Sequence, residues 1–415
     1  MKKLVLLFLT VFALYANAQD NTQWATTWAT APEFTGKSDM PQTTELTDCS
    51  VREIIHVSFG GKQLRMQFSN EFSKEPVEIK SVYIANLTAD ENGRNDLSGT
   101  DYTAIVKKSV RYLTFNGKRN VTIDAGQAIF SDATNFNLQP LQRLSITICY
   151  GKTPVNATSH RGSRTTSYIM KGEAKPGKKF ITFEKLDHWY SISALDVNGE
   201  GNECIPAIGN SITDGRGTTT NLQNRWTDIA NEHLIGRQNN PAGIEYGVVN
   251  LGIGGNCVLN GGLSEPAVKR FERDVMSQRN FKYIIIYEGI NDIGGSNGRS
   301  EQVARDLMDA YKRFIKTAHE RGVKVLMATI LPFGKSFYDE GNWFKEAARQ
   351  TVNQWIRTSK DIDGVIDFDE VMRDPQNPLQ LREEWQEDWL HPNAKGYEVM
   401  GRYAAERIQA LTAGK

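Results

Sequence analysis

Four short polar segments in the second half of the chain contain the residue types that nucleophilic catalysis requires: residues 208–215, 250–256, 288–294 and 388–393. In the first segment, Ser211 stands between an apolar run and Gly215. This setting can expose a serine hydroxyl beside a backbone N–H, as a catalytic nucleophile needs. A serine in a turn is more often only a turn residue, so this segment is weak evidence by itself.

The second and third segments contain groups that could donate hydrogen bonds to an oxyanion. Segment 250–256 reads Asn-Leu-Gly-Ile-Gly-Gly-Asn, and glycines let a ligand approach backbone N–H groups closely. The segment lacks the GxGxxG and Gly-Lys-Ser/Thr patterns of phosphate-binding loops. In the third segment, the Asn291 side chain is a possible amide donor. A helix cap or an Asx turn would explain this asparagine equally well.

The fourth segment places Asp388 and His391 three residues apart. One turn of chain can then bring the carboxylate to a ring nitrogen, which fixes the imidazole tautomer and leaves the other nitrogen as a general base. A lone histidine is more often structural. An aspartate at this spacing, just before a predicted helix, favours a catalytic pair.

The elements that must position these segments follow an alternating β and α pattern after a polar linker at 198–202. We expect strands at 205–208, 246–251, 283–287, 323–330 and 365–368, and helices at 225–234, 303–318, 343–356 and 394–411. Residues 283–287 (YIIIY) are apolar throughout, which is typical of a strand covered on both faces. The pattern predicts a three-layer α/β/α domain with a parallel sheet, whose ligands bind beyond the carboxyl ends of its strands.

The first half of the chain has the period of two that β-strands show. Apolar residues alternate with polar ones at 55–59, 64–68 and 144–149, and Gly60-Gly61 separates the first two runs. Asn116-Gly117 predicts a tight hairpin between 112–115 and 121–123. We expect an all-β sandwich domain. The Gly-, Ser- and Lys-rich stretch 151–179 is interpreted as long loops within it.

The N-terminus and the composition suggest an exported protein of neutral charge. Two lysines, an apolar run and Ala16-Asn17-Ala18 have the layout of a signal peptide, with a retained anchor as the alternative. We expect a signal peptide at 1–18, a β-sandwich accessory domain at 19–200 and the α/β domain with the four polar segments at 201–415, in the periplasm or outside the cell. With 49 basic and 49 acidic side chains, charge supports neither a nucleic acid nor a membrane as partner.

Four cysteines stand at positions 49, 149, 204 and 257, and two interpretations remain open. One is disulfide pairing within each half, Cys49 with Cys149 and Cys204 with Cys257. The other is four buried free thiols. Without a CxxC motif or a cluster of His and Cys, a structural zinc site has no support.

Taken together, the four segments resemble the SGNH (GDSL-type) hydrolases, a family with a flavodoxin-like α/β/α fold. The resemblance covers about 204–415. It implies that Ser211 is the nucleophile and that Asp388 and His391 complete its triad. It also implies that the oxyanion hole is formed by the backbone N–H groups of Ser211 and Gly255 and by the Asn291 side chain, with Gly254 as the alternative to Gly255. It implies no metal and no organic cofactor. The family usually has Asp where this chain has Asn210, and we hypothesise that Asn210 is tolerated because Asp388 orients the histidine.

The whole chain also resembles a two-domain subgroup whose members carry an N-terminal β-sandwich. The matching features are Trp24-Ala25-Thr26-Thr27-Trp28-Ala29, Arg52 with the Gly60-Gly61 turn, residues 289–294 (GINDIG), and Trp355-Ile356-Arg357 with Asp363. This subgroup implies a secreted esterase that removes small acyl groups, acetyl first, from polysaccharide. A lipase or lysophospholipase and a non-catalytic carbohydrate-binding protein are the alternatives. The sandwich could bind sugar or only buttress the cleft, and Trp189, Tyr190, Trp343 and Trp389 could stack on sugars or serve as core.

Overall fold

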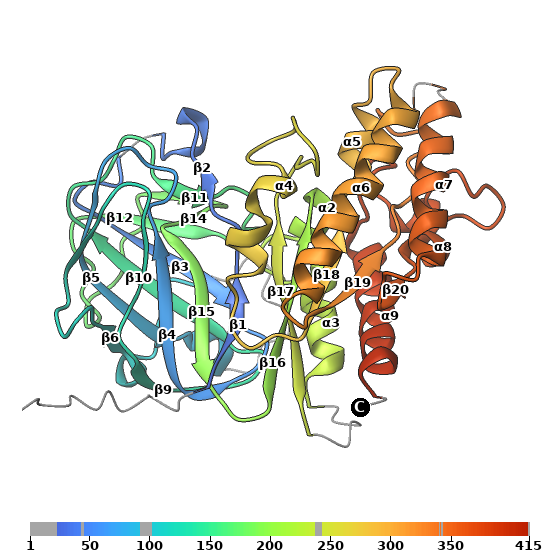
Figure 1. Ribbon diagram of the computed structural model, residues 1–415. Helices are drawn as coiled ribbons and strands as arrows, with labels where there is room; N and C mark the ends of the chain where they lie inside the picture. Colours follow the sequence, from blue (N-terminus) through green and yellow to red (C-terminus); the bar gives the residue numbers. More distant parts are fainter. Residues whose placement is uncertain are drawn as a thin grey trace, which may run out of the picture.

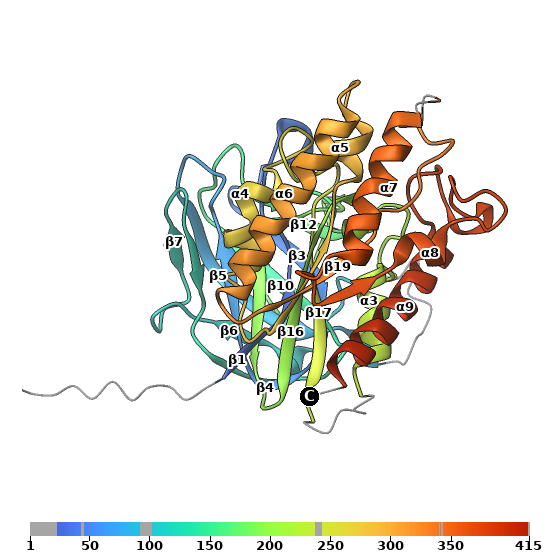
Figure 2. The same cartoon turned by 45° about the vertical axis from the view of Figure 1, so that its right-hand side comes forward.

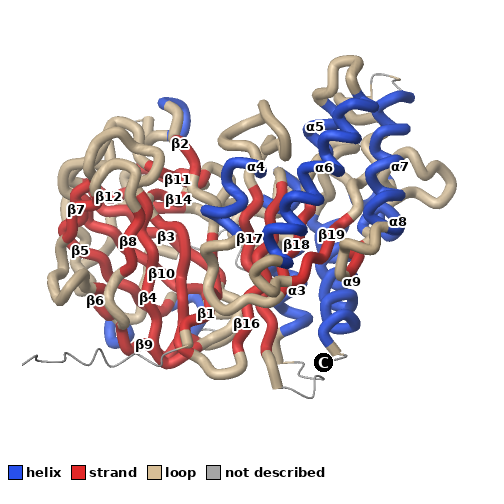
Figure 3. The backbone as a smooth tube through the Cα atoms, viewed as in Figure 1, coloured by secondary structure: helices blue, strands red, loops and turns tan. Residues whose placement is uncertain are grey.

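The computed structural model describes residues 23–42, 45–91, 102–236, 243–339, 341 and 343–413. The expected signal peptide at 1–18 lies outside these residues. The described chain has two halves of different character (Figures 1 and 3): an antiparallel β half, residues 24–198, and an α/β half, residues 202–413. Among the helices of the described residues, none combines the length and the apolar composition that crossing a membrane requires.

The β half consists of two packed sheets and a small third one. The larger sheet runs in the order β13 (Glu184–Leu186), β12 (Ser167–Lys171), β3 (Cys49–His56), β10 (Arg143–Tyr150), β5 (Val77–Asn86) and β6 (Arg111–Leu113), with β7 (Val121–Ile123) also on β5. The second contains β1 (Trp24–Ala29), β15 (Ile192–Asn198), β4 (Gly61–Ser69), β8 (Ala128–Phe130) and β9 (Thr134–Leu138). The third contains β14 (Trp189–Tyr190), β11 (Thr158–His160) and β2 (Glu33–Phe34). Short helices are η1 (Lys37–Asp39), α1 (Thr88–Glu91) and η2 (Lys107–Ser109).

The alternating apolar residues form the core between the two larger sheets, as the period of two predicts. In β4, Leu64, Met66 and Phe68 are fully buried while their neighbours are half-exposed. They belong to the same apolar cluster as Val51 of β3 and Ile146 of β10. The all-β sandwich is therefore confirmed. The Gly60-Gly61 turn does not close a hairpin, because β3 and β4 belong to different sheets.

Two local predictions in the β half need correction. The Asn116-Gly117 turn forms, with φ of 51° and 78° and mutual hydrogen bonds between Phe115 and Lys118. The strands beside it, however, pair with β5 rather than with each other. The stretch 151–179 is not all loop, because it contains β11 and β12, and β12 pairs with β3. Both strands are short, Thr-Ser-His in β11 and Ser-Tyr-Ile-Met-Lys in β12, so neither shows a run of apolar alternation, and pairing to neighbouring strands satisfies their backbone groups.

The α/β half has a five-stranded parallel sheet in the order β17 (Glu245–Gly252), β16 (Asn202–Gly209), β18 (Tyr283–Tyr287), β19 (Lys324–Ala328) and β20 (Gly364–Ile366). Long helices cover it: α3 (Trp226–Leu234) packs with α9 (Ala394–Thr412), and α6 (Ser300–His319) with α7 (Trp343–Thr358) (Figure 2). Shorter helices are α2 (Ser211–Asp214), α4 (Ala267–Arg270), η3 (Phe271–Val275), α5 (Ile290–Gly294), α8 (Phe368–Met372) and η4 (Glu383–Trp385).

This strand order is that of a flavodoxin-like doubly wound sheet, as predicted. The order reverses where β16 lies between β17 and β18, and ligands of such sheets bind at that reversal. One predicted boundary is wrong: Phe368 begins helix α8, whereas we expected it to end the last strand. All four cysteines are buried free thiols, so the second of the two interpretations holds.

The two halves share one continuous apolar core. Strand β1 packs beside β16 and β17 (Figure 1). The backbone N–H of Thr26 donates to the carbonyl oxygen of Arg279 at 3.2 Å, and the N–H of Arg279 donates to Thr26 Oγ1 at 3.0 Å. Gly247 of β17 lies so close to β-half residues that a Cβ there would be 2.4 Å from Ser58 Oγ and 2.8 Å from the Phe59 ring.

We therefore expect Gly247→Val to destabilise the protein by about 1–3 kcal/mol, because the added side chain pushes the halves apart. The measurement is the free energy of unfolding in urea. Gly177→Ala is the matched control, because no heavy atom lies within 4 Å of a Cβ at that position. Equal stabilities of the two variants would contradict close packing between the halves at β17.

Candidate active site

Ser211 lies at the carboxyl end of β16, where the chain turns directly into α2. The residue before it, Asn210, has φ of −100° and ψ of −153°, and its side-chain oxygen accepts a hydrogen bond of 3.0 Å from the Ile212 N–H. This cap makes Ser211 the first residue of the helix. Gly215, with φ of 98°, ends α2 in a conformation that favours glycine. The serine is thus held between strand and helix, as the sequence predicted.

The structure brings Ser211, His391 and Asp388 into one hydrogen-bonded chain. The distance from Ser211 Oγ to His391 Nε2 is 2.8 Å, and His391 Nδ1 lies 2.9 Å from Asp388 Oδ2. Asp388 Oδ1 also accepts the backbone N–H of Leu390 at 3.1 Å and of His391 at 2.8 Å. The carboxylate is therefore fixed at one edge of the imidazole, which leaves Nε2 as the nitrogen that faces the serine.

Burial and hydrogen bonds set the protonation of this pair. Burial lowers the pKa of His391 below its usual value, although the hydrogen bond that its Nδ1–H donates to Asp388 acts in the opposite direction. Burial alone would raise the pKa of Asp388, but its hydrogen bonds to His391 and to the backbone outweigh this, so its pKa is lowered. At neutral pH the pair is therefore an aspartate and a neutral imidazole. A neutral imidazole can accept a proton, as a general base must.

The expected oxyanion donors line the same cavity as Ser211 and His391. Gly254 and Gly255 both lie in its wall, so the structure does not choose between them. Gly255 has φ of 71°, a conformation that favours glycine. Asn291 Nδ2 donates to the carbonyl oxygen of Asn256 at 2.7 Å. An amide nitrogen has two hydrogens, so the second remains available to a ligand in the cavity.

The orientation of the Asn291 amide is fixed from both ends. Its Oδ1 accepts a hydrogen bond of 3.0 Å from Tyr338 OH, while its Nδ2 is held by Asn256. Gly289, two residues earlier, has φ of 120°, and a Cβ there would lie 2.5 Å from Tyr311 OH. Only glycine therefore lets the chain leave β18 on the path that places Asn291 in the cavity wall. Sequence analysis found Asn291 and missed Tyr338, which no motif marked.

The cavity has a volume of about 460 Å³ and is lined by both halves of the chain. The α/β half contributes Ser211, Asp388, His391, the oxyanion candidates and six further side chains: Asp214, Arg216, Leu263, Phe337, Tyr338 and Leu390. The β half contributes six lining residues that sequence analysis missed: Glu33, Asp39, Arg161, Gly162, Arg164 and His188. Three of these six, Arg161, Gly162 and Arg164, fall in the stretch 151–179 that we interpreted as loop. Their composition gave no signal of a site.

His160 of β11 joins the β half to α2, the helix that begins with Ser211. Its Nδ1 lies 3.0 Å from the carbonyl oxygen of Ala31 and its Nε2 lies 2.9 Å from Asp214 Oδ1. A carbonyl and an ionised carboxylate can only accept, so both nitrogens must carry hydrogen and the ring is an imidazolium. Burial alone would lower the pKa of His160, but Asp214 and Glu33 outweigh burial and raise it. The pKa of Asp214 is lowered correspondingly, against the effect of burial.

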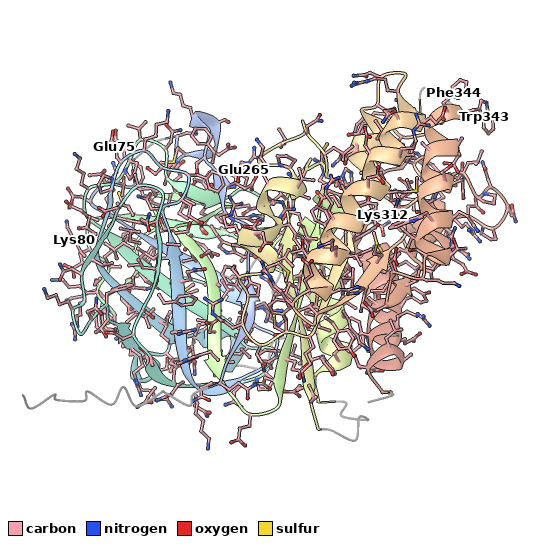
Figure 4. All side chains as sticks on the ribbon, in the orientation of Figure 1. Glu75, Lys80, Glu265, Lys312, Trp343 and Phe344 are labelled. Atoms are coloured by element: carbon pink, nitrogen blue, oxygen red, sulfur yellow. The ribbon has the colours of Figure 1, made fainter. Side chains whose placement is uncertain are left out.

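The aromatic residues considered for sugar stacking divide into core and surface. Trp189 is buried, with its ring 5.0 Å from that of Trp28, and Tyr190 is fully buried, so both are core residues. Trp389 is half-buried, and Lys335 Nζ lies 4.2 Å from its ring centre. Trp343 is 71% exposed and projects with Phe344 at the start of α7 (Figure 4). It lines a separate cavity of about 230 Å³.

In the described part of the chain, no group of three or more His, Cys, Asp or Glu side chains is arranged to hold a metal ion. The arrangement at Ser211 can instead support chemistry by a serine alkoxide, a neutral histidine and amide donors. Its order along the chain is Ser211, then Asp388, then His391.

Comparison with known proteins gives a family. Residues 207–399 match the model of the GDSL-like lipase/acylhydrolase family. No curated protein matches the chain. One similar solved structure is a GDSL-like lipase from Bacteroides thetaiotaomicron, with 19% identity, 50% of this chain and 87% of that chain covered, and a TM-score of 0.36. A carbohydrate acetylesterase family member from Sinorhizobium meliloti has 14% identity, with 51% of this chain and 99% of that chain covered and a TM-score of 0.37. A member of the lipolytic G-D-S-L family from Veillonella parvula has 20% identity, with 49% of this chain and 97% of that chain covered and a TM-score of 0.36. The match identifies residues 207–399, within the α/β half, as a domain of the GDSL-like lipase/acylhydrolase family.

Proposed function

We propose that this protein is an exported serine esterase that removes small acyl groups, acetyl first, from polysaccharide. The observation that carries the proposal is the hydrogen-bonded chain from Asp388 through His391 to Ser211 Oγ, which opens into a cavity lined by both charged and apolar side chains. Export rests on the signal peptide expected at 1–18 and is part of the proposal.

The proposed reaction is acyl transfer in two steps. His391 Nε2 takes the proton of Ser211 as Oγ attacks the ester carbonyl. The carbonyl oxygen becomes an oxyanion, which the N–H groups of Ser211 and Gly255 and the Nδ2–H of Asn291 stabilise. The intermediate collapses, the alcohol leaves with the proton from His391, and the acyl group remains on Ser211. Water, activated by His391, then releases the acid and restores the serine.

The chemistry of the cavity wall supports a polar substrate over a lipid. Seven acidic, basic or histidine side chains line it besides the triad: Glu33, Asp39, Arg161, Arg164, His188, Asp214 and Arg216. Placing a long alkyl chain against charged groups would remove them from water without a compensating hydrogen bond, which is unfavourable. Sugar hydroxyl groups can hydrogen-bond to the same side chains. A lipase-type activity and a non-catalytic sugar-binding role are the alternatives, and the next experiment separates them.

We expect the mature protein to hydrolyse 4-nitrophenyl acetate faster than 4-nitrophenyl butyrate or octanoate. We expect Ser211→Ala to lower kcat by about 10³-fold or more, because no other group can form the acyl-enzyme. The measurement is initial rate of nitrophenol release, followed by acetate release from acetylated xylan and pectin. Ser277→Ala, which removes an exposed hydroxyl elsewhere, is the control. A preference for octanoate would favour a lipase, and no difference from Ser211→Ala would favour a binding protein.

The pH profile tests the role of His391. The neutral imidazole is the active form, so kcat/KM must fall as the pH drops through the pKa of His391 in the free enzyme. Burial lowers that pKa. We therefore expect the midpoint of the acid limb below pH 6.5 for hydrolysis of 4-nitrophenyl acetate, with a plateau at neutral pH. His319→Gln, at an exposed histidine that contacts Asp363, should leave the limb in place. A midpoint clearly above 6.5 would argue against this assignment.

Asn210→Asp tests whether the departure at position 210 matters. An aspartate oxygen can accept the same hydrogen bond from the Ile212 N–H, and Asp388 already orients His391. We expect kcat for 4-nitrophenyl acetate to change less than about tenfold. Asn210→Ala, which removes the cap, should instead destabilise the protein by about 0.5–2 kcal/mol. An increase of several orders of magnitude in Asn210→Asp would mean that the natural protein is impaired or non-catalytic.

A further inference from the structure

The loop between β11 and β12, residues 161–166, is built against the α/β half. The backbone carbonyl oxygen of Arg164 accepts a hydrogen bond of 2.9 Å from the backbone N–H of Asn221. The backbone N–H of Thr166 donates a hydrogen bond of 2.8 Å to Asn221 Oδ1. A Cβ at Gly162 would lie 1.9 Å from Asp214 Oδ2, so only glycine allows this approach. These contacts make the loop a fixed part of the cavity wall, and its side chains are positioned before any substrate arrives.

Arg164 has an unfavourable backbone and a guanidinium with unused donors. Its φ is 49°, which costs a non-glycine residue about 1–3 kcal/mol and is commonest at functional sites. Its Nε is buried and has no hydrogen-bond partner among the described residues. Its anionic contact is Asp214, 3.7 Å from Nη2, and that carboxylate already accepts a hydrogen bond from His160. The side chain is 30% exposed, in the wall of the cavity that contains Ser211.

The neighbouring carboxylates are already occupied. Glu33 is paired with Arg161, with contacts of 2.6 and 3.2 Å from the guanidinium. Asp388 is bound to His391, and Asp39 accepts the backbone N–H of Gly36 at 3.2 Å. None of these three lies within ion-pair distance of Arg164. Apart from its 3.7 Å ion pair with Asp214, the Arg164 guanidinium therefore has no carboxylate of the wall bound to it, whereas these three acids each have a partner.

A second guanidinium lies in the same wall. Arg216 is about half exposed, and its Nε is 4.0 Å from Glu387 Oε2, a contact at the limit of an ion pair. Both arginines line the cavity together with Ser211. A planar guanidinium matches the two oxygens of a carboxylate, and such pairs are about twice as strong as neutral hydrogen bonds. The unused binding capacity of the site is thus for an anionic oxygen group.

We infer that Arg164 binds a carboxylate on the acylated substrate, with Arg216 beside it, so that the preferred substrate is an ester on an acidic sugar such as a uronic acid. The inference rests on the proposed esterase function and specifies its substrate class. The β half then takes part in substrate recognition, because it supplies the residue that selects the acidic sugar. Arg164 is a specificity residue and does not touch the reacting atoms.

The test uses one polymer in two charge states. Acetylated pectin with most of its carboxyl groups methylated is compared with the same pectin after treatment with a pectin methylesterase, which exposes carboxylates and leaves acetyl groups. We expect kcat/KM for acetate release by the wild type to rise about tenfold after treatment, as a charge-assisted pair gains over a neutral contact. Arg164→Gln should bring the ratio of the two values to about one, and Arg164→Lys should give an intermediate ratio.

Arg402→Gln is the matched control, because it removes one positive charge from an exposed pair with Glu398 on α9, away from the cavity. It should keep the wild-type ratio. The inference is overturned if the wild type shows no preference for the treated pectin. It is also overturned if the Arg164→Gln variant keeps that preference. If wild-type hydrolysis of 4-nitrophenyl acetate is absent, the proposed function itself has failed. If that hydrolysis depends on Ser211 while the preference is missing, only the role of Arg164 is wrong.

A second measurement covers the case in which Arg164→Gln does not fold. Trigalacturonate should inhibit wild-type hydrolysis of 4-nitrophenyl acetate competitively, and this inhibition should weaken as salt is added, because a partly exposed charge pair is screened. Xylotriose, a neutral sugar of the same length, should inhibit at least tenfold more weakly. Equal inhibition by the two trisaccharides would contradict recognition of a carboxylate.

Discussion

The buried side chains of His160 and Asp214 form a hydrogen bond across the boundary between the two halves of the chain, with 2.9 Å between His160 Nε2 and Asp214 Oδ1. Asp214 lies three residues after Ser211, in the same helix α2. Each ring nitrogen of His160 faces an acceptor, so the ring is charged, and a charged ring can be buried only beside carboxylates such as Asp214 and Glu33. Removing either partner would leave the other charge buried with only its weaker contacts, Glu33 for His160 and Arg164 for Asp214, and breaking a buried pair typically destabilises by about 3–5 kcal/mol. The helix that begins with Ser211 is therefore held in place from the β half.

This pair explains why the cavity has walls from both halves. Once His160 is bound to Asp214, the residues that follow it must cross the mouth of the parallel sheet, and Gly162 passes Asp214 where a side chain would not fit. Arg161 and Arg164 are thereby brought into the wall of the cavity. A β-sandwich attached by a flexible linker could bind sugar independently of the active site. Here the shared core and the His160 contact make the sandwich one side of the site itself.

Two buried histidines close to Ser211 have opposite protonation for reasons that the geometry makes plain. His391 has one carboxylate partner, and burial lowers its pKa. His160 has Asp214 and Glu33 as anionic neighbours, which together outweigh burial and raise its pKa. The first histidine is thus a neutral base and the second a structural cation. The contribution of His160 to stability is present below its unfolded pKa and is lost as the pH rises through its raised folded pKa.

The sequence by itself determined the fold class of both halves and the residues that meet at Ser211. Strand and helix periods are local properties, and parallel strands bring their carboxyl ends to one edge, so the segments near 211, 255 and 291, which each follow a strand, were expected to converge. The role of residues 151–179 was decided only by the tertiary structure, because β11 and β12 are stabilised by pairing with distant strands rather than by their own apolar pattern. The same holds for His160, Arg164 and Tyr338. The hydrogen-bond partner of His160 is Asp214, 54 residues away, and that of Tyr338 is Asn291, 47 residues away. Contacts over such separations depend on how the two halves pack, and no spacing within the sequence records them.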